Sequence, residues 1–166
     1  ILLPHMAADL GLSLSGPFGI LSLGLFFGGM LAPVAGKLID RYGGRWVMTF
    51  GSTMAALAVI SLSQVKGPVG LFTGILLAEA AGMFVLYNAA FASVARLDLN
   101  VPTQKSISVI TLFGGVASTI FWPLTLAIYT AIGWQTTWML LGATLLVTCA
   151  PIHFFALRRR DIPMDS

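Results

Sequence analysis

The sequence predicts an all-α protein, a polytopic bundle of membrane-spanning helices. Two observations carry this prediction. Hydrophobic residues make up 57% of the 166 residues and charged residues only 9%, whereas a water-soluble domain carries about 25% charged residues. Long stretches also lack any Asp, Glu, Lys or Arg, and a helix needs about 20 apolar residues to cross a bilayer. The composition excludes an ordinary soluble enzyme domain, a disordered tail and a nucleic-acid-binding domain.

Several stretches are long and apolar enough to cross the membrane. The predicted spans are 16–38, 46–65, 69–95, 106–131 and 136–157. The last two form one uncharged run that a weak turn at residues 132–135 divides. Because the chain begins with Ile and shows no signal-peptide pattern, we expect it to be part of a longer protein. Residues 1–8 are then the tail of a preceding helix, and residues 158–166 are a cytoplasmic tail or the start of a linker.

Basic residues predict the orientation, because Lys and Arg near helix ends stay on the cytoplasmic side. Of the nine basic residues, only Lys66 falls in a loop on the opposite side of the membrane. The remaining eight fall on alternate loops that share one face: Lys37, Arg41, Arg45, Arg96, Lys105, Arg158, Arg159 and Arg160. We therefore expect these loops and the carboxy-terminal end to be cytoplasmic in a plasma membrane or bacterial inner membrane.

The sequence offers little support for a disulfide, a metal site or a phosphate-binding loop. Cys149 is the only cysteine, so no disulfide can form within the chain. His5 and Asp9 are four residues apart and supply half a metal site at best. A phosphate-binding loop is not encoded, because Leu38 follows Lys37 where Ser or Thr is needed. We expect no metal, no cofactor and no nucleic-acid partner.

Small residues four apart predict close helix packing, because little hydrophobic force acts between helices in lipid. Such pairs are Gly24 with Gly28, Ala32 with Gly36, Gly70 with Gly74, and Ala78 with Gly82. Pro33, Pro123 and Pro151 lie inside predicted spans and are expected to kink them. The pattern favours a tight, kinked bundle over a set of isolated anchors.

The loop at residues 36–45 resembles the signature loop that joins the second and third helices of major facilitator superfamily transporters. The matching positions are Gly36, Asp40, Arg41, Gly43 and Arg45. Gly44 departs from the family pattern, which often has a basic residue there, and we expect a looser turn. The resemblance covers essentially the whole chain as helices two to six with the end of helix one. It implies the amino-terminal six-helix half of a major facilitator fold, with the carboxy-terminal half of the same protein as its partner.

In that family the signature loop is a conformational latch on the cytoplasmic side. Asp40 at a membrane interface can pair with a cation or with a helix N-terminus. We expect Arg96 to be its nearest basic partner outside the loop, with Asp98 available to Arg41 or Arg45. The simpler alternative is that these charges only fix the topology.

The predicted span 69–95 contains one charged residue, Glu79, which lies deep in the membrane. An ionised side chain that faced lipid at this depth would cost at least about 2–3 kcal/mol. Glu79 must face a polar cavity, find a cation or stay protonated, as a proton-coupled site does. An uninterrupted helix would place Met83 and Tyr87 on the same face and Asn88 on the opposite one. Glu79, Met83 and Tyr87 are therefore the candidate substrate or proton site, with packing as the alternative for Glu79.

Phe121 and Trp122 precede Pro123 and form a bulky group beside a kink, which is either a gate or packing. The resemblance further implies that helices one and four line the central cavity, two and five meet the other half, and three and six face lipid.

The predicted function is secondary active transport of a small solute by alternating access, with proton coupling as an option. A hydrophobic or amphipathic solute fits better than a polyanion. The alternatives are a non-transporting membrane scaffold or sensor and, less favoured, a membrane-embedded enzyme, which would need clustered acids or a Ser and His at depth.

Overall fold

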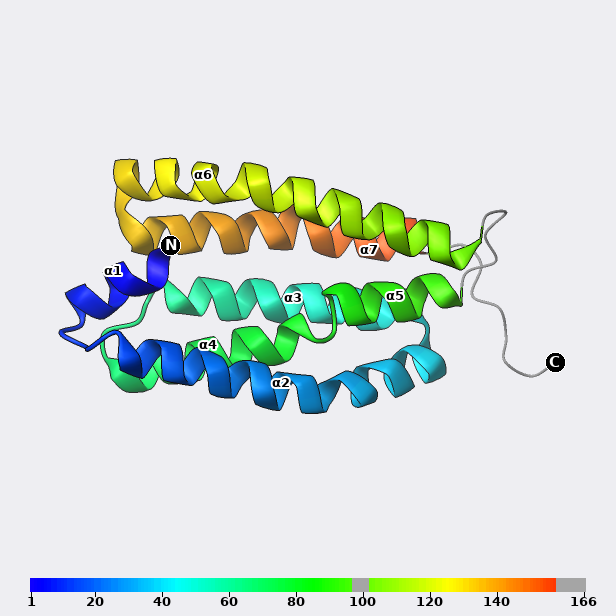
Figure 1. Cartoon of the computed structure of the whole chain (residues 1–166), viewed down its shortest axis with the longest axis horizontal. Helices are drawn as coiled ribbons and strands as arrows, with labels where there is room; N and C mark the ends of the chain where they lie inside the picture. The colour runs from blue at the N-terminus through cyan, green and yellow to red at the C-terminus, as the bar shows by residue number, and fades with distance from the viewer. Residues whose placement is uncertain (97–101, 158–166) are drawn as a thin grey trace.

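The computed structural model describes residues 1–96 and 102–157, and within them the secondary structure is entirely helical, which confirms the predicted fold class. Figure 1 shows the helices lying nearly parallel in an elongated bundle. The elements are α1 (Leu2–Asp9), α2 (Ser15–Tyr42), α3 (Gly44–Leu62), α4 (Pro68–Gly82), α5 (Tyr87–Ala95), α6 (Thr103–Thr144), the π-helical segment η1 (Leu145–Cys149) and α7 (Ala150–Ala156).

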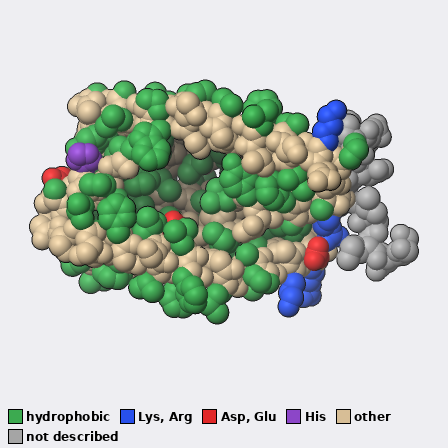
Figure 2. Space-filling model, viewed as in Figure 1, with side chains coloured by type: hydrophobic (Ala, Val, Ile, Leu, Met, Phe, Trp, Pro, Cys, Tyr) green, Lys and Arg blue, Asp and Glu red, His purple; other side chains and the backbone are tan. Residues whose placement is uncertain are grey.

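The surface of the bundle is apolar along its length. Four helical stretches of the described residues are long and apolar enough to cross a membrane: Ser15–Tyr42, Gly44–Leu62, Pro68–Ala95 and Thr103–Ala156. Large apolar side chains such as Phe26 and Phe113 are 65% and 70% exposed. Figure 2 shows hydrophobic side chains spread over the middle of the molecule and the Lys and Arg side chains of this face gathered at one end. An apolar exterior of this extent fits a lipid environment.

The last apolar stretch reverses direction at Gly133. This residue has a φ of 77°, in the left-handed region that glycine tolerates best. Figure 1 shows the two arms, before and after this point, running side by side. The reversal therefore lies within the weak turn expected at residues 132–135.

α2 and α3 are joined by a single residue, Gly43, which has a φ of 80°. Its N–H donates to the carbonyl of Ile39 at 2.9 Å and closes the last turn of α2. α2 is longer than the predicted span and runs on to Tyr42, so most of the signature loop is helical. A left-handed glycine immediately after the helix is a common way to end one.

The predicted span 69–95 is interrupted, which differs from the expectation of one continuous helix. α4 ends at Gly82, residues 83–86 form turns, and Leu86 is extended with a ψ of −164°. A Cβ on Gly51 of α3 would lie 2.7 Å from the Phe84 Cβ and 2.8 Å from its carbonyl oxygen. The interruption thus brings the backbone of Phe84 directly against α3, a contact that only glycine permits.

α3 lies between α4 on one side and the arms of α6 and α7 on the other. Of the four membrane-length stretches it is the one most covered by its neighbours. α3 nevertheless exposes one apolar side, formed by Trp46, Phe50, Met54 and Leu57, so its burial does not contradict the lipid-facing place that the family resemblance implies for the third helix. Small residues explain the enclosure, because Ala56 and Ala58 are buried and Gly142 of α6 leaves room for Ile60.

Two buried apolar clusters stabilise opposite ends of the bundle. The first cluster, at the end where α1 lies, contains Leu2, Met6, Ile20, Leu62, Leu71, Ile75 and Trp134. The second, where α2 meets α3 and α5, contains Ile39, Val47, Met48 and Ala89. Met6, Ile39 and Leu71 are among the largest fully buried side chains. Members of the first cluster, among them Leu2, Met6 and Leu62, also line the cavity that Glu79 faces.

Candidate functional site: a charged helix end and an acidic cavity

The signature loop is tied to the far end of α5 by an ion pair. The Arg96 guanidinium lies 3.0 Å from an Asp40 carboxylate oxygen and also donates to the Ile39 carbonyl at 3.1 Å. Arg96 is largely buried, with 14% of its side chain exposed, whereas Asp40 is 58% exposed. The expected pairing of Asp40 with Arg96 is therefore present. Asp98, the residue expected to be available to Arg41 or Arg45, lies outside the described residues.

Arg45 contacts aromatic rings rather than an acid among the described residues. Its guanidinium carbon lies 4.0 Å from the ring centre of Phe154 in α7 and 5.0 Å from that of Trp46. Arg41 lies 5.3 Å from the ring of Tyr42. A guanidinium over an aromatic face is a favourable cation–π contact. Arg45 thus joins the start of α3 to the end of α7.

The glycines of the signature loop have different roles. Gly44 is buried, and a Cβ there would lie 2.7 Å from the Ser93 Cβ of α5. The expected looser turn is wrong, since Gly44 marks a tight contact between α3 and α5. A Cβ on Gly36 would meet no described atom within 4 Å. Gly36 therefore makes no close approach to the described residues of this chain.

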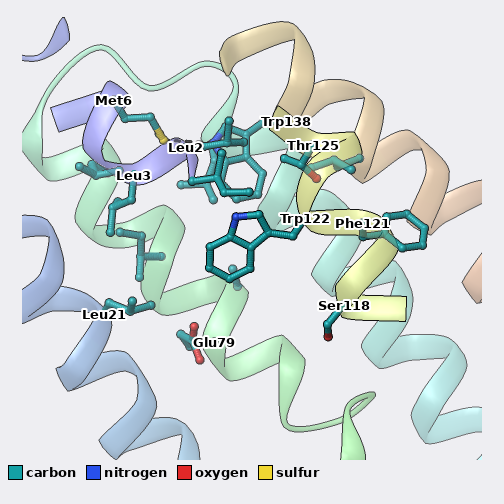
Figure 3. A pocket seen from close by; sticks show the side chains of 16 residues that line it. Leu2, Leu3, Met6, Leu21, Glu79, Ser118, Phe121, Trp122, Thr125 and Trp138 are labelled. Atoms are coloured by element: carbon teal, nitrogen blue, oxygen red, sulfur yellow. Dashed lines mark hydrogen bonds between the residues drawn. The ribbon is translucent and has the colours of Figure 1, made fainter. Parts of the chain in front are cut away.

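Glu79 faces a cavity of about 470 Å³ between α1, α2, α4 and α6. Gly24 of α2 makes room for it, because a Cβ on that residue would lie 2.9 Å from the Glu79 Cγ. Figure 3 shows the carboxylate of Glu79 at one side of the cavity and the indole of Trp122 between it and Trp138. The sequence argument for a carboxylate facing a cavity, rather than lipid, matches this geometry.

Met83 and Tyr87 do not line this cavity. Met83 still shares a helix face with Glu79, as expected, because the two side chains lie against Gly28 and Gly24, one turn apart in α2, whereas Tyr87 does not share it. The interruption at residues 83–86 changes the helical register between Glu79 and Tyr87. Met83 lies against Gly28 of α2, and its sulfur is 4.0 Å from the amide nitrogen of Asn88, the residue expected on the opposite face. Tyr87 instead packs on Phe91, with ring centres 5.5 Å apart, and its hydroxyl contacts Gly114 of α6.

Phe121 and Trp122 both line the cavity that contains Glu79. They come from α6, beside Pro123, and so lie across the cavity from α4. The candidate gate and the candidate acid therefore share one cavity, although no local pattern in the sequence predicts that they lie together.

Two polar contacts were missed by sequence reasoning. Ser52 of α3 is 1% exposed, and its hydroxyl lies 2.7 Å from Nδ1 of His153 in α7. Neither residue lines the cavity with Glu79, so this pair is an interhelical hydrogen bond. At the opposite end, the Trp134 indole N–H donates to the Asp9 carboxylate at 2.6 Å. The partners are 101 and 125 residues apart in the chain, and no local pattern connects them.

The two titratable side chains of α1, His5 and Asp9, both contact residues of α6. His5 stacks on Tyr129 with ring centres 4.2 Å apart. Within residues 1–96 and 102–157, no three His, Cys, Asp or Glu side chains come close enough together to hold a metal ion.

Comparison of the sequence with models of known protein families shows which family the chain belongs to. The family model of the Major Facilitator Superfamily matches residues 1–165. The chain therefore belongs to the major facilitator superfamily, whose members are membrane transporters rather than enzymes. No match was found among curated proteins or among solved structures. A transporter of the major facilitator type that crosses the membrane several times accounts for the helices, the apolar surface and the signature loop together.

Proposed function

We propose that this chain moves a small solute across the membrane by alternating access, with the solute bound in the Glu79 cavity. The observation that carries the proposal is a cavity midway along an otherwise apolar bundle, with one carboxylate inside it. Transporters of this superfamily bind their solutes near the bilayer midplane, where two helical halves meet. In this proposal the chain supplies the amino-terminal half.

The ion pair at the signature loop supports a two-state mechanism. It joins the end of α2 to the end of α5, so a movement of either helix end must change the Asp40 to Arg96 distance. In the proposal this pair is part of the cytoplasmic latch, and Lys37, Arg41 and Arg45 face the cytoplasm with it.

The interrupted helix supports movement as well. α4 carries Glu79 and α5 carries Arg96, and residues 83–86 connect them without regular helix. The solute site and the latch therefore lie on two helical segments joined by a short non-helical link, which packs against α3 through Phe84. In this mechanism a rearrangement of the link couples one to the other.

Glu79 is also the candidate for proton coupling. A carboxyl group that exchanges a proton with each side in turn would link solute movement to a pH gradient. Such coupling requires the Glu79 carboxyl group to open to each side of the membrane in turn.

Counterflow in proteoliposomes tests the proposal. Vesicles containing the purified protein are loaded with a high concentration of a candidate solute and diluted into a trace of the same labelled solute. An alternating-access transporter accumulates label transiently, because exchange is faster than net flow. A scaffold or sensor gives the same slow entry as protein-free vesicles, and that result across a broad panel of solutes would contradict the proposal.

A further inference from the structure

The chemistry of the Glu79 cavity indicates the class of solute that it accepts. Its volume of about 470 Å³ falls in the range of about 300–1,000 Å³ that small-molecule sites occupy. Most of its lining is aliphatic or aromatic, and Glu79, Ser118 and Thr125 are the lining residues with polar side-chain oxygens. The solute therefore needs an apolar body and few polar groups.

The charge inside the cavity has one sign. Among the described residues that line it, Glu79 is the only one with an ionisable side chain, and none is Lys, Arg or His. The basic side chains visible in Figure 2 lie at the end of the bundle, away from the hollow in its middle. A carboxylate in a place of low dielectric constant attracts a cation and repels an anion far more strongly than in water.

Aromatic rings complete the surroundings of that carboxylate. Figure 3 shows the indole of Trp122 inside the cavity with Glu79 to one side of it, while Trp138 lies beyond and Phe121 points away along α6. The faces of aromatic rings attract cations, and Trp attracts them best. The Trp138 N–H donates to the sulfur of Met6 at 3.0 Å, which fixes the second indole as a wall of the cavity.

We propose that the cavity binds an organic cation with a single positive charge and apolar substituents, its charged centre held between the Glu79 carboxylate and the Trp122 indole. This inference deepens the proposed function and rests on it for the transport step, but binding itself can be measured separately. A solute whose only charge is negative would meet Glu79 with no cation in the cavity lining to offset it. The cavity therefore discriminates by sign of charge as well as by size.

Two probes of nearly the same shape and opposite charge test the sign preference. Labelled tetraphenylphosphonium and tetraphenylborate are added to the purified protein in detergent, and the amount bound is measured with excess unlabelled probe as the blank. We expect saturable binding of the phosphonium and none of the borate. Saturable borate binding equal to or tighter than that of the phosphonium overturns the proposal, as does the absence of phosphonium binding to protein with a helical circular dichroism spectrum.

Matched variants then locate the site. Glu79→Gln keeps the size and removes the charge, and it should weaken phosphonium binding by about tenfold or more, the usual effect of losing a charge-assisted contact. Asp9→Asn, outside the cavity lining, should leave binding unchanged. Trp122→Leu should weaken binding by about threefold or more, whereas Trp46→Leu, at the start of α3, should not. Unchanged affinity in Glu79→Gln overturns the proposal.

Uptake separates this inference from the proposed function. The phosphonium is lipophilic enough to cross a bilayer unaided, so its entry and exchange are compared with those in protein-free vesicles. If it binds in a Glu79-dependent manner and the protein speeds neither its entry nor its exchange, the cation site stands and the transport proposal fails. If the protein carries another solute in counterflow while excess phosphonium does not inhibit it, transport stands and the cation site is wrong.

Discussion

Arg96 holds Asp40 and the carbonyl of Ile39 with one guanidinium nitrogen, at 3.0 and 3.1 Å. The residues belong to helix ends that are 56 positions apart in the chain. Because Arg96 is the more buried partner, loss of Asp40 leaves a buried cation with fewer contacts, whereas loss of Arg96 leaves a carboxylate that water can solvate. The two losses should therefore differ in their cost.

The first prediction concerns this asymmetry. Asp40→Ala should leave membrane insertion and abundance near normal and lower transport by about fivefold or more, because about 1–3 kcal/mol of one state's stability is lost. Arg96→Gln should lower thermal stability less than Asp40→Ala does. Initial rates of counterflow and unfolding midpoints of the purified variants measure both effects. Wild-type rates in Asp40→Ala would exclude the latch role.

The second prediction concerns two glycines of the same loop. Gly44→Ala should destabilise the protein by about 1–3 kcal/mol, because a Cβ there overlaps Ser93 and a well-packed contact must open. Gly36→Ala is the matched control, since open space surrounds that position within the described residues and alanine favours a helix by about 1 kcal/mol. Thermal unfolding of both variants measures the difference. Equal midpoints would show that the α3 to α5 contact is not tight.

The contact at Gly44 also shows where sequence reasoning succeeds and fails. Composition and charge-free stretches determine that the chain is a membrane bundle, because lipid imposes a length and a polarity on every helix. The signature loop adds the family and the expectation that Arg96 meets Asp40. A glycine in place of a basic residue was interpreted as a looser turn, because the nearness of Ser93 depends on how α3 and α5 pack and leaves no mark in the local sequence.

The cavity shows a similar limit. The helical wheel placed Met83 and Tyr87 beside Glu79, and it failed for Tyr87 because the backbone breaks at residues 83–86. No proline marks that break, and the glycine that permits the contact, Gly51, lies on another helix. Phe121 and Trp122 were singled out for their bulk, but their position opposite Glu79 comes from the tertiary arrangement of α6.

The third prediction concerns orientation. Single cysteines at Lys66 and Gln135, in a Cys149→Ser background, should react with a membrane-impermeant thiol reagent added outside intact cells. Cysteines at Tyr42 and Asn100 should react only after the membrane is opened, because the basic loops stay in the cytoplasm. Gel mobility after labelling measures each position. The opposite pattern would reverse the orientation and place the Asp40 to Arg96 pair on the outer side.

The last prediction concerns the proton. Glu79→Gln keeps the size and the hydrogen-bonding capacity of the side chain, but it cannot release or take up a proton. If Glu79 couples solute movement to the pH gradient, this variant should still exchange solute in counterflow, with the weaker binding that the loss of charge causes, and should lose gradient-driven accumulation entirely. The two assays use the same vesicles, with and without an imposed pH difference. Asp9→Asn, whose carboxylate accepts from Trp134 outside the cavity, serves as the matched control and should accumulate solute normally. Accumulation by Glu79→Gln that still rises with the pH difference would leave Glu79 as a binding or packing residue, and the coupling group would then have to be sought elsewhere.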